Sequence, residues 1–473
     1  MTGTMIHCGL FGHVDAGKTS VARVLTEIVS TAGLDAHPQS KKRGTIDLGF
    51  TSFQLGEYQV ALVDAPGHAD LIRSAVASAS IIDVAILVID AQKGPEVQTG
   101  EHMVILEALG ITRIVVAMNK IDLLPDEAAI DEKAGVLKAF LEKSGPPFAT
   151  APVIPISAEH KTNVDGLLAA LHDAIDQAPI TRDVDGDLFM LFDHHFQVKG
   201  FGTVITGTIL SGTVRVGDTV EISPLGMAGK VKTINMFKEE REIARAGDRA
   251  GMSIAGIDNE KLFRGCVVCT PGTVQATQQI LVEGKLTRFF KHELAFKSQV
   301  HLTTGMYTVP ASFFPYAREN DLDMIVDTVA NSTGTSAFTA FVRVSEPIPC
   351  RPGMPLLISR LDLKPTELRI AAGGRVAAIV EEPPVLYRMR EKVGKIKDPD
   401  KGVVEGLAES ITGAEFLARK EVLASWTEDH GEITVKGRIL GTFGTKGNVR
   451  VDFEGPVSQG AVVKLQYPRA IKI

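Results

Sequence analysis

The feature that most constrains the fold is a glycine-rich segment close to the start of the chain. Residues 12–19 match the pattern G-x-x-x-x-G-K-[ST], between an apolar run and a stretch with apolar residues at helical spacing. Successive backbone N–H groups of such a loop, with the N-terminus of the following helix, can cradle phosphates. We therefore predict a strand–loop–helix unit that binds a nucleotide, with Lys18 at the β- and γ-phosphates and the Thr19 hydroxyl on Mg²⁺. The residues predicted to line this cradle are Asp15, Gly17, Lys18, Thr19 and Ser20.

A second apolar run, VALVDAPGHAD, predicts a strand that ends in Asp64 and turns at Pro66-Gly67. A carboxylate at this strand end can hold Mg²⁺ directly or through water. Gly67 can bring its backbone N–H to the γ-phosphate because no Cβ stands in the way.

A third run, RIVVAMNKID, identifies the base. It predicts a buried strand followed by Asn119, Lys120 and Asp122. A carboxylate at the end of this strand can accept both N1–H and N2–H₂ of guanine, whereas adenine lacks that pair of donors. The run VIPISAE adds a fourth strand, which places Ser157 and Ala158 to offer backbone N–H groups to the guanine O6. The nucleotide is therefore predicted to be GTP or GDP.

Four motifs in this order and spacing resemble those of the translational GTPases, and the resemblance covers residues 1 to about 178. It implies that His68 orients the attacking water, because phosphoryl transfer needs positioning more than covalent chemistry. It also implies a second Mg²⁺ hydroxyl from Thr45, in the first switch loop. The alternative interpretation of His68 is a surface histidine on a mobile loop.

The first switch loop departs from the family pattern. Relatives usually read R-G-I-T-I, whereas this chain reads Arg43-Gly44-Thr45-Ile46. The missing apolar residue stands where the family forms half of a hydrophobic gate against the P-loop valine, here Val14. That gate holds the catalytic histidine away from the phosphate until the ribosome engages. This departure predicts either that the switch loop follows a different path to the nucleotide site or that the hydrophobic gate is altered.

Length and composition limit the class of protein. A chain of 473 residues suggests about three or four domains. Its apolar runs are shorter than the roughly 20 residues needed to span a membrane. Four cysteines are too few for a disulfide framework in so long a chain, so we predict a cytoplasmic protein. The net charge is −7, yet residues 388–473 hold 15 Lys and Arg against 12 Asp and Glu. This distribution is compatible with one RNA-facing end.

The remainder of the chain is mostly β-structure. Short β-rich runs alternate with glycine turns after a polar linker at about residues 178–187, which is typical of small barrels. The charged stretch YRMREKVGKIKDPDK is interpreted as a linker or an exposed edge. The predicted fold is multidomain: an α/β P-loop GTPase domain followed by three mainly β-barrel domains. The predicted domain ranges are 1–178, 188–275, 276–387 and 396–473.

The last range repeats an earlier pattern. GTVITGTILSGTVRVGDTVEI and KGRILGTFGTKGNVRVDFEGPVSQGAVVKL share glycine-punctuated strands and a late Gly-x-x-Val. We predict a fourth domain with a barrel of the second-domain type and a helix around AEFLARKEVLAS. The alternative explanation is that the two segments share only the residue pattern typical of small barrels, without common ancestry.

A GTPase domain followed by two barrels resembles elongation factor EF-Tu and its relatives. The presence of a fourth domain narrows this resemblance. The segments KKRGTIDLGF, DAPGHADLIR and GPEVQTGEHM in the first domain and GRILGTFGTKG in the last resemble the archaeal and eukaryotic type of SelB, the selenocysteine-specific elongation factors. The resemblance implies a monomer, not bound to membranes, that binds GTP with Mg²⁺, hydrolyses it and delivers selenocysteinyl-tRNA to the ribosome at recoded UGA codons. It also implies that the fourth domain contacts a SECIS RNA or the protein that binds it.

The segment LFDHHFQVKG begins the second domain and carries Asp193, His194 and His195. SelB proteins resemble this chain in an Asp-His pair here and in an arginine that Arg249 matches. The resemblance implies that Asp193, His194 and Arg249 bind the aminoacyl group, where their charge would favour an anionic selenolate over serine. Adjacent strand residues point to opposite faces, so Asp193 and His194 share a pocket only if the strand is bulged or just starting. The alternative is that Asp193, His194 and His195 are wholly structural. A metal site is not favoured, because no third and fourth ligands are evident.

Other functions stay open at this stage. One alternative is a carrier of a different aminoacyl-tRNA, and another is a metabolic GTPase subunit of the sulfate adenylyltransferase type. The pair Cys266 and Cys269 could indicate zinc or redox chemistry. Without a second pair, these cysteines are better interpreted as buried apolar residues. This interpretation also argues against translation initiation factor two gamma, whose relatives often carry zinc-type cysteines.

Overall fold

The structure is a computed structural model that describes residues 4–29, 49–64, 81–177, 180–198, 202–236, 239–331, 336–364, 367–428 and 431–473. By its internal contacts the chain divides into two compact units. Unit 1 comprises residues 1–315 and 327–382, and unit 2 comprises residues 316–326 and 383–473. The four predicted domain ranges stay predictions.

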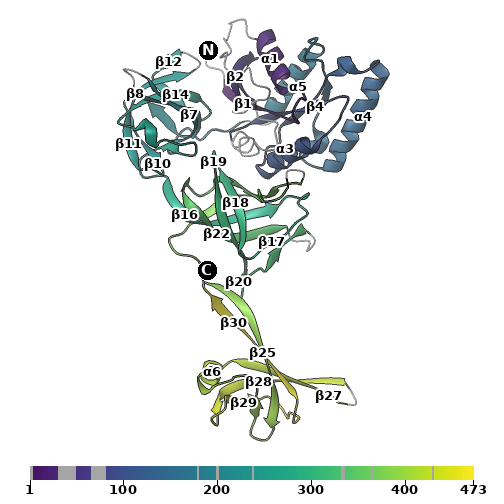
Figure 1. The fold of residues 1–473 in the computed structure, drawn as a ribbon, viewed down its shortest axis with the longest axis vertical. Coiled ribbons are helices and arrows are strands. Elements are labelled where there is room, and N and C mark those ends of the chain that lie inside the picture. Colours follow the sequence, from purple (N-terminus) through teal and green to yellow (C-terminus); the bar gives the residue numbers. More distant parts are fainter. Residues whose placement is uncertain are drawn as a thin grey trace. The chain divides into compact units, whose positions relative to one another are not determined.

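The described part of the N-terminal region forms a six-stranded sheet with the order β2-β3-β1-β4-β5-β6 (Figure 1). Its pairings are parallel except for the β2–β3 hairpin. The strands are β1 (Thr4–Phe11), β2 (Gly49–Leu55), β3 (Tyr58–Asp64), β4 (Val84–Asp90), β5 (Ile114–Asn119) and β6 (Val153–Pro155). The helices are α1 (Lys18–Val29), α3 (Val97–Ala108), α4 (Glu127–Ser144) and α5 (Val164–Asp176), with short 3₁₀ turns at Ile121–Leu123 and Phe148–Thr150.

Burial explains why these segments form a parallel sheet. Every residue of β4 and β5 is buried, as expected for strands that helices cover on both faces. The carboxyl ends of parallel strands meet at one edge of a sheet, where ligands bind in open α/β folds. The segments after β1, β5 and β6 therefore bring predicted nucleotide residues together.

The second region forms a closed β-barrel in unit 1. Six of its described strands follow the order β7-β8-β14-β11-β10-β15, and β15 pairs back to β7. The strands are β7 (Phe189–Val198), β8 (Gly202–Ser211), β9 (Thr213–Arg215), β10 (Thr219–Ser223), β11 (Met227–Met236), β12 (Glu239–Arg241), β13 (Ile243–Arg245), β14 (Arg249–Ala255) and β15 (Val267–Cys269), with a 3₁₀ turn at Asn259–Lys261. The predicted small barrel is confirmed.

A second barrel of unit 1 has another connectivity. Its described strands follow the order β16-β22-β19-β18-β23-β24, and β24 pairs back to β16. The strands are β16 (Gln275–Leu286), β17 (Leu294–Ala295), β18 (Ser298–Thr304), β19 (Tyr307–Glu319), β21 (Thr328–Val329), β22 (Ala337–Cys350), β23 (Pro355–Ser359) and β24 (Ile370–Ile379). The end of β19 belongs to unit 2.

Unit 2 contains the C-terminal barrel. Its described strands follow the order β25-β26-β29-β28-β27-β30, and β30 pairs back to β25. They are β20 (Leu322–Ile325), β25 (Leu386–Asp398), β26 (Val403–Glu405), β27 (Glu421–Glu428), β28 (Gly431–Phe443), β29 (Asn448–Phe453) and β30 (Val462–Ile471), with helix α6 (Ile411–Phe416). Numbered along the chain, the order is 1-2-5-4-3-6, the same as in the β7–β15 barrel, and every pairing in both is antiparallel. The predicted repeat is therefore present in the topology.

Two interpretations of the C-terminal sequence need correction. The charged stretch interpreted as a linker or an exposed edge is not a linker, because it forms β25, in which residues 386–395 pair with 462–471. Residues 389–391 are exposed on this strand, in agreement with the edge interpretation. The expected helix ends at Phe416, and Glu421–Glu428 is strand β27. Arg419 has φ = +68°, which interrupts the helix. Val422 and Ala424 are buried while Leu423 is exposed, so the period of the pattern is that of a strand.

No helix within the described residues is both long enough and apolar enough to cross a membrane.

Candidate functional site

The P-loop connects β1 to α1 and packs tightly against the sheet. A Cβ on Gly12 would lie 2.1 Å from the Val88 carbonyl oxygen, and a Cβ on Gly17 would lie 2.3 Å from Nδ2 of Asn119. Gly12 and Gly17 also have positive φ angles of 139° and 96°. The close approach to β4 and β5 therefore requires glycine at both positions.

Lys18 is buried at the start of α1. Its Nζ donates hydrogen bonds to the carbonyl oxygens of Gly12 (3.0 Å) and His13 (2.9 Å). The ammonium group thus lies inside the loop predicted to hold the phosphates. The next residue, Thr19, is exposed, as a hydroxyl that binds a metal must be. Asp15 adopts φ = +61° at the tip of the loop.

Two residues of α3 hold the P-loop in place. Nδ1 of His102 accepts a hydrogen bond from the Gly12 backbone N–H (2.9 Å), and Oε1 of Gln98 accepts one from Val14 N–H (2.9 Å). The sequence reasoning did not predict either role. Both residues lie in GPEVQTGEHM, so the resemblance of this segment to the family was the only indication in the sequence that they have a role.

Asn119 joins the predicted phosphate and base motifs. Its Nδ2 donates to the Ala16 carbonyl (3.0 Å), and its Oδ1 accepts from the Ala158 N–H (3.0 Å). Asn119 is 2% exposed. The Ala158 N–H that was predicted for guanine O6 is thus bonded to Asn119 here.

Asp122 is oriented by the serine of the fourth motif. The Ser157 hydroxyl donates to Oδ1 of Asp122 (2.5 Å) and accepts from the His160 N–H (3.1 Å). Nearby, Nζ of Lys120 lies 2.7 Å from Oδ2 of Asp90. Burial would raise the pKa of Asp90, but hydrogen bonds from Lys120 and from backbone N–H groups outweigh it and lower the pKa. The base motifs therefore form one hydrogen-bonded corner.

The structure does not describe several of the predicted site residues. Thr45, Gly67 and His68 lie outside the described residues, as does the altered switch sequence at 43–46. Asp64 ends β3, with its backbone alone described. The roles of these residues stay predictions.

The trio Asp193, His194 and Arg249 comes together on the outer face of the β7–β15 barrel. The pairing of β7 with β8 shifts register between Phe192 and His194, so the strand is bulged at Asp193. This is the condition under which neighbouring Asp193 and His194 share one site. Nδ1 of His194 lies 2.5 Å from Oδ1 of Asp193. Arg249 donates two parallel hydrogen bonds to the same carboxylate, at 2.7 and 2.8 Å.

Burial distinguishes the members of this trio. The side chains of Asp193 and Arg249 are 1% and 9% exposed, whereas that of His194 is 44% exposed. Burial would raise the pKa of Asp193, but hydrogen bonds from Arg249 and His194 outweigh it and hold the pKa below its ordinary value. Asp193 is thus ionised and neutralises Arg249. Any net positive charge must come from a proton on His194, the member that solvent reaches.

Glycine permits the bulge. A Cβ on Gly207 of β8 would lie 2.1 Å from the Leu191 carbonyl oxygen and 2.5 Å from Cα of Phe192. His195 lies apart from the trio: its Nδ1 is 3.1 Å from Oδ1 of Asn259, and its ring packs edge-on against Phe192. These contacts indicate a packing role for His195.

The cysteine pair matches the apolar interpretation. Cys266 and Cys269 are free and buried. Burial raises the pKa of Cys266 to about 11 and that of Cys269 to about 12. Thiols with so high a pKa are poor metal ligands and poor nucleophiles.

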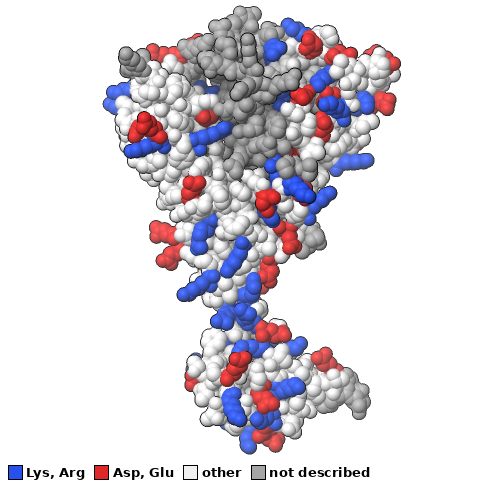
Figure 2. Space-filling model, in the orientation of Figure 1, with Lys and Arg blue, Asp and Glu red and all other residues white. Residues whose placement is uncertain are grey.

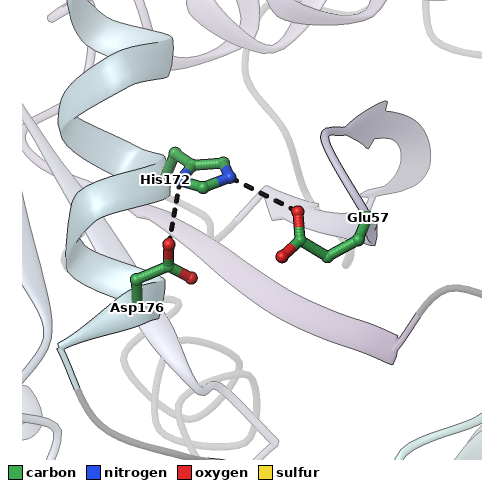
Figure 3. Close-up of side chains that lie close together, drawn as sticks. All are labelled: Glu57, His172 and Asp176. Carbon is green, nitrogen blue, oxygen red and sulfur yellow. Dashed lines mark ion pairs between the residues drawn. The ribbon is translucent and has the colours of Figure 1, made fainter.

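A different cluster joins the β2–β3 hairpin to α5. In Figure 3, His172 lies between two carboxylates: its Nε2 is 3.6 Å from Glu57 and its Nδ1 is 3.2 Å from Asp176. The Tyr58 hydroxyl donates to Asp176 at 2.6 Å. Because the two ring nitrogens face different carboxylates, the geometry is that of an ion-pair bridge rather than a chelate.

Comparison with protein families matches three parts of the chain. Residues 3–177 match the elongation factor Tu GTP-binding domain, and residues 202–269 match elongation factor Tu domain 2. Residues 274–380 match domain III of the archaeal selenocysteine-specific elongation factor.

Whole-chain comparisons agree. The selenocysteine-specific elongation factor of Methanocaldococcus jannaschii is 41% identical over 98% of this chain and 97% of its own length. The mouse factor of the same name is 39% identical over 68% of this chain and 59% of its own length. The crystal structure of SelB from Methanococcus maripaludis, in complex with the GTP analogue GppNHp, matches with a TM-score of 0.80, 36% identity and full coverage of both chains. Identity at this level over nearly the entire length places this chain in the family of selenocysteine-specific elongation factors.

Proposed function

We propose that this chain is a translational GTPase that carries selenocysteinyl-tRNA to the ribosome for insertion at recoded UGA codons. The observation that carries the proposal is the buried, bidentate Asp193–Arg249 pair with His194 beside it. It lies on the second domain of a chain that resembles selenocysteine-specific factors along its whole length.

The P-loop would hold the phosphates of GTP. Lys18 is already oriented into the loop by two carbonyl oxygens, and a γ-phosphate would compete for the same donor. Mg²⁺, when bound, would supply positive charge that neutralises the phosphates during transfer. The hydroxyls of Thr19 and Thr45 and the Asp64 carboxylate would hold this ion. His68 would orient the attacking water.

The base corner would select guanine. Ser157 fixes one oxygen of the Asp122 carboxylate, and the group can still accept the two guanine donors, because an ionised carboxylate has about four acceptor sites. Asn119 would keep the P-loop in register with this corner. Preorganised acceptors reduce the entropy lost on binding.

The trio would discriminate amino acids by charge. A selenol is more acidic than a thiol, so selenocysteine is largely anionic at neutral pH, while cysteine is mostly neutral and serine is always neutral. Asp193 and Arg249 cancel one another, so a protonated His194 gives the trio a net charge of +1. A selenolate beside His194 would gain a charge-assisted hydrogen bond. Serine would forgo that bond, at a cost of about 1–3 kcal/mol.

The C-terminal barrel is proposed to face RNA. Its strand β25 carries five basic residues against two acidic ones, and basic and acidic side chains intermingle over this unit in Figure 2. Arg438, Lys446 and Arg450 are candidate contacts. A SECIS RNA, or the protein that binds it, is the proposed partner. We propose a cytoplasmic monomer, since translation takes place in the cytoplasm.

Protection of the aminoacyl ester from hydrolysis tests this function. Selenocysteine, cysteine and serine would be attached to one tRNA body and compared with the protein in a GTP-analogue state. We expect strong protection of the selenocysteinyl ester and weak protection of the other two.

Other outcomes would favour the alternatives. Equal protection of all three esters would indicate a general carrier whose specificity resides in the tRNA. An absence of protection for every ester would contradict the carrier function and favour a metabolic GTPase.

A further inference from the structure

His7 is a buried histidine that none of the predicted nucleotide or aminoacyl contacts uses. It lies on β1, the strand that leads into the P-loop, and is 1% exposed. Its neighbours Ile6 and Cys8 belong to the main core of the sheet. Because successive strand residues face opposite sides, His7 points away from that core.

The imidazole contacts the second domain. Nε2 of His7 lies 2.7 Å from the carbonyl oxygen of Gly247, 240 residues away in the chain. Gly247 stands two residues before Arg249, in the turn that begins β14. That turn is fixed to β8, because Gly247 N–H donates to Ile209 (2.8 Å) and Ile209 N–H donates to Asp248 (3.0 Å). A shift of His7 is therefore transmitted to the start of β14.

A partly buried ion pair between Arg182 and Asp83 holds the backbone of His7. The His7 backbone N–H donates to Asp83 at 2.8 Å. Arg182 binds the same carboxylate through both terminal nitrogens, at 2.9 and 2.6 Å, and donates to the Met5 carbonyl at 3.1 Å. A Cβ on Gly247 would lie 2.7 Å from Nε of Arg182. Arg182 thus packs against Gly247 while it binds the carboxylate that accepts from the His7 backbone.

The bond defines the tautomer of His7. A carbonyl oxygen only accepts, so Nε2 must carry the hydrogen. Burial lowers the pKa of His7; Asp83 opposes this effect, and Arg182 and Arg249 add to it. Nδ1 is buried with no partner among the described residues. Burial of a lone acceptor is unfavourable, so an apolar side chain would serve a simple packing role better.

We propose that His7 is a positioning residue for Arg249. Through the Gly247 carbonyl it fixes the turn that presents Arg249 to Asp193, and so ties the aminoacyl trio to the strand that ends in the nucleotide site. The inference rests on the proposed aminoacyl role of the trio. It predicts that His7 affects the choice of amino acid without contacting either ligand.

The test compares His7→Leu, which has similar volume but no donor, with His7→Gln, which keeps a neutral N–H donor. The readout is the ratio of ester half-lives for selenocysteinyl- and seryl-tRNA on one tRNA body, with the affinity for a GTP analogue measured in parallel. We expect the ratio to fall about tenfold in His7→Leu, from the loss of one buried hydrogen bond. His7→Gln should recover most of the ratio, with nucleotide affinity unchanged in both. If His7→Leu does not fold, His7→Ala takes its place.

Arg288→Ala is the matched control. Arg288 joins other elements of unit 1 through Glu107 and the carbonyl oxygen of Ser144, so its loss weakens a long-range contact without touching the Gly247 turn. We expect an unchanged ratio. If the wild type has a ratio well above one and His7→Leu has the same ratio, the positioning role is overturned and the proposed pocket stands. An equal loss of protection for both esters in His7→Leu would have the same meaning. A wild-type ratio near one would overturn the proposed pocket and this inference with it.

Discussion

The β7–β15 barrel and the C-terminal barrel share one strand order yet carry very different charge pairs. In both, the first and second strands shift register, at Phe192/His194 in one and at Ile396/Asp398 in the other. The first bulge bears the buried Asp193–Arg249 pair. The second bears Lys397, which lies 3.3 Å from Glu405 with both side chains at least half exposed. The difference teaches that a barrel topology allows a bulge on its outer face, while burial decides whether the charges there can define a site.

The largest expected effect comes from breaking the buried pair. Arg249→Ala leaves the Asp193 carboxylate buried without its main partner, which typically costs about 3–5 kcal/mol. We expect a marked loss of stability of unit 1 in chemical denaturation. The double variant Asp193→Leu/Arg249→Leu removes both charges and should recover most of that loss. A single variant as stable as the wild type would contradict the assigned burial.

The bulge itself can be tested next. Gly207→Ala forces a Cβ into the backbone at Leu191 and Phe192, and overpacking of this kind costs about 1–3 kcal/mol. Gly455→Ala in the C-terminal barrel is the control, because its Cβ would meet a side chain only at 3.9 Å. Denaturation of the two variants should show a loss for Gly207 alone. Equal losses would mean that the bulge does not depend on glycine.

Acid should affect the two barrels differently. The pKa of Asp193 is lowered in the folded state, so its contribution to stability is present above the unfolded-state pKa of about 3.9 and is lost as pH falls through the folded value. Asp398 also has a lowered pKa, chiefly from the backbone N–H of Lys401, and its side chain is 35% exposed. Carboxyl NMR titration should find both pKa values low. Asp193→Asn and Asp398→Asn should therefore both flatten the acid limb of the stability curve. Asp193→Asn should do so more strongly, because its carboxylate is buried against Arg249 and His194.

The smallest effect is expected for Lys397→Ala. Exposed ion pairs contribute little after solvent screening and side-chain entropy are counted, typically below about 1 kcal/mol. We expect a change near the detection limit of a denaturation experiment, and a still smaller one in high salt. A loss as large as that of Arg249→Ala would remove the distinction between the two barrels.

Local chemistry explains which parts of the site could be predicted. The P-loop, Asn119 and Asp122 are each defined by a few consecutive residues, and their backbone requirements can be derived from sequence. The contacts of Gln98 and His102 with the P-loop and of His7 with Gly247 join residues more than 80 apart. No local pattern encodes such pairings.

The same reasoning applies to the fold. The barrel class followed from glycine spacing, and the repeat predicted a shared topology. The linker alternative for β25 was wrong because its partner β30 lies some seventy residues later in the chain. The helix predicted after Phe416 failed because a left-handed Arg419 ends it. Long-range pairing and single backbone angles are decided by packing.

The central claim is that His194 gives the trio its net positive charge. The most direct test is the ratio of ester half-lives for selenocysteinyl- and seryl-tRNA on wild type and on His194→Gln, which keeps hydrogen bonding but cannot be protonated. The account predicts a ratio well above one for wild type and a fall of about tenfold or more for the variant. An unchanged ratio would contradict it and place the discrimination in another part of the protein, because both esters share one tRNA body.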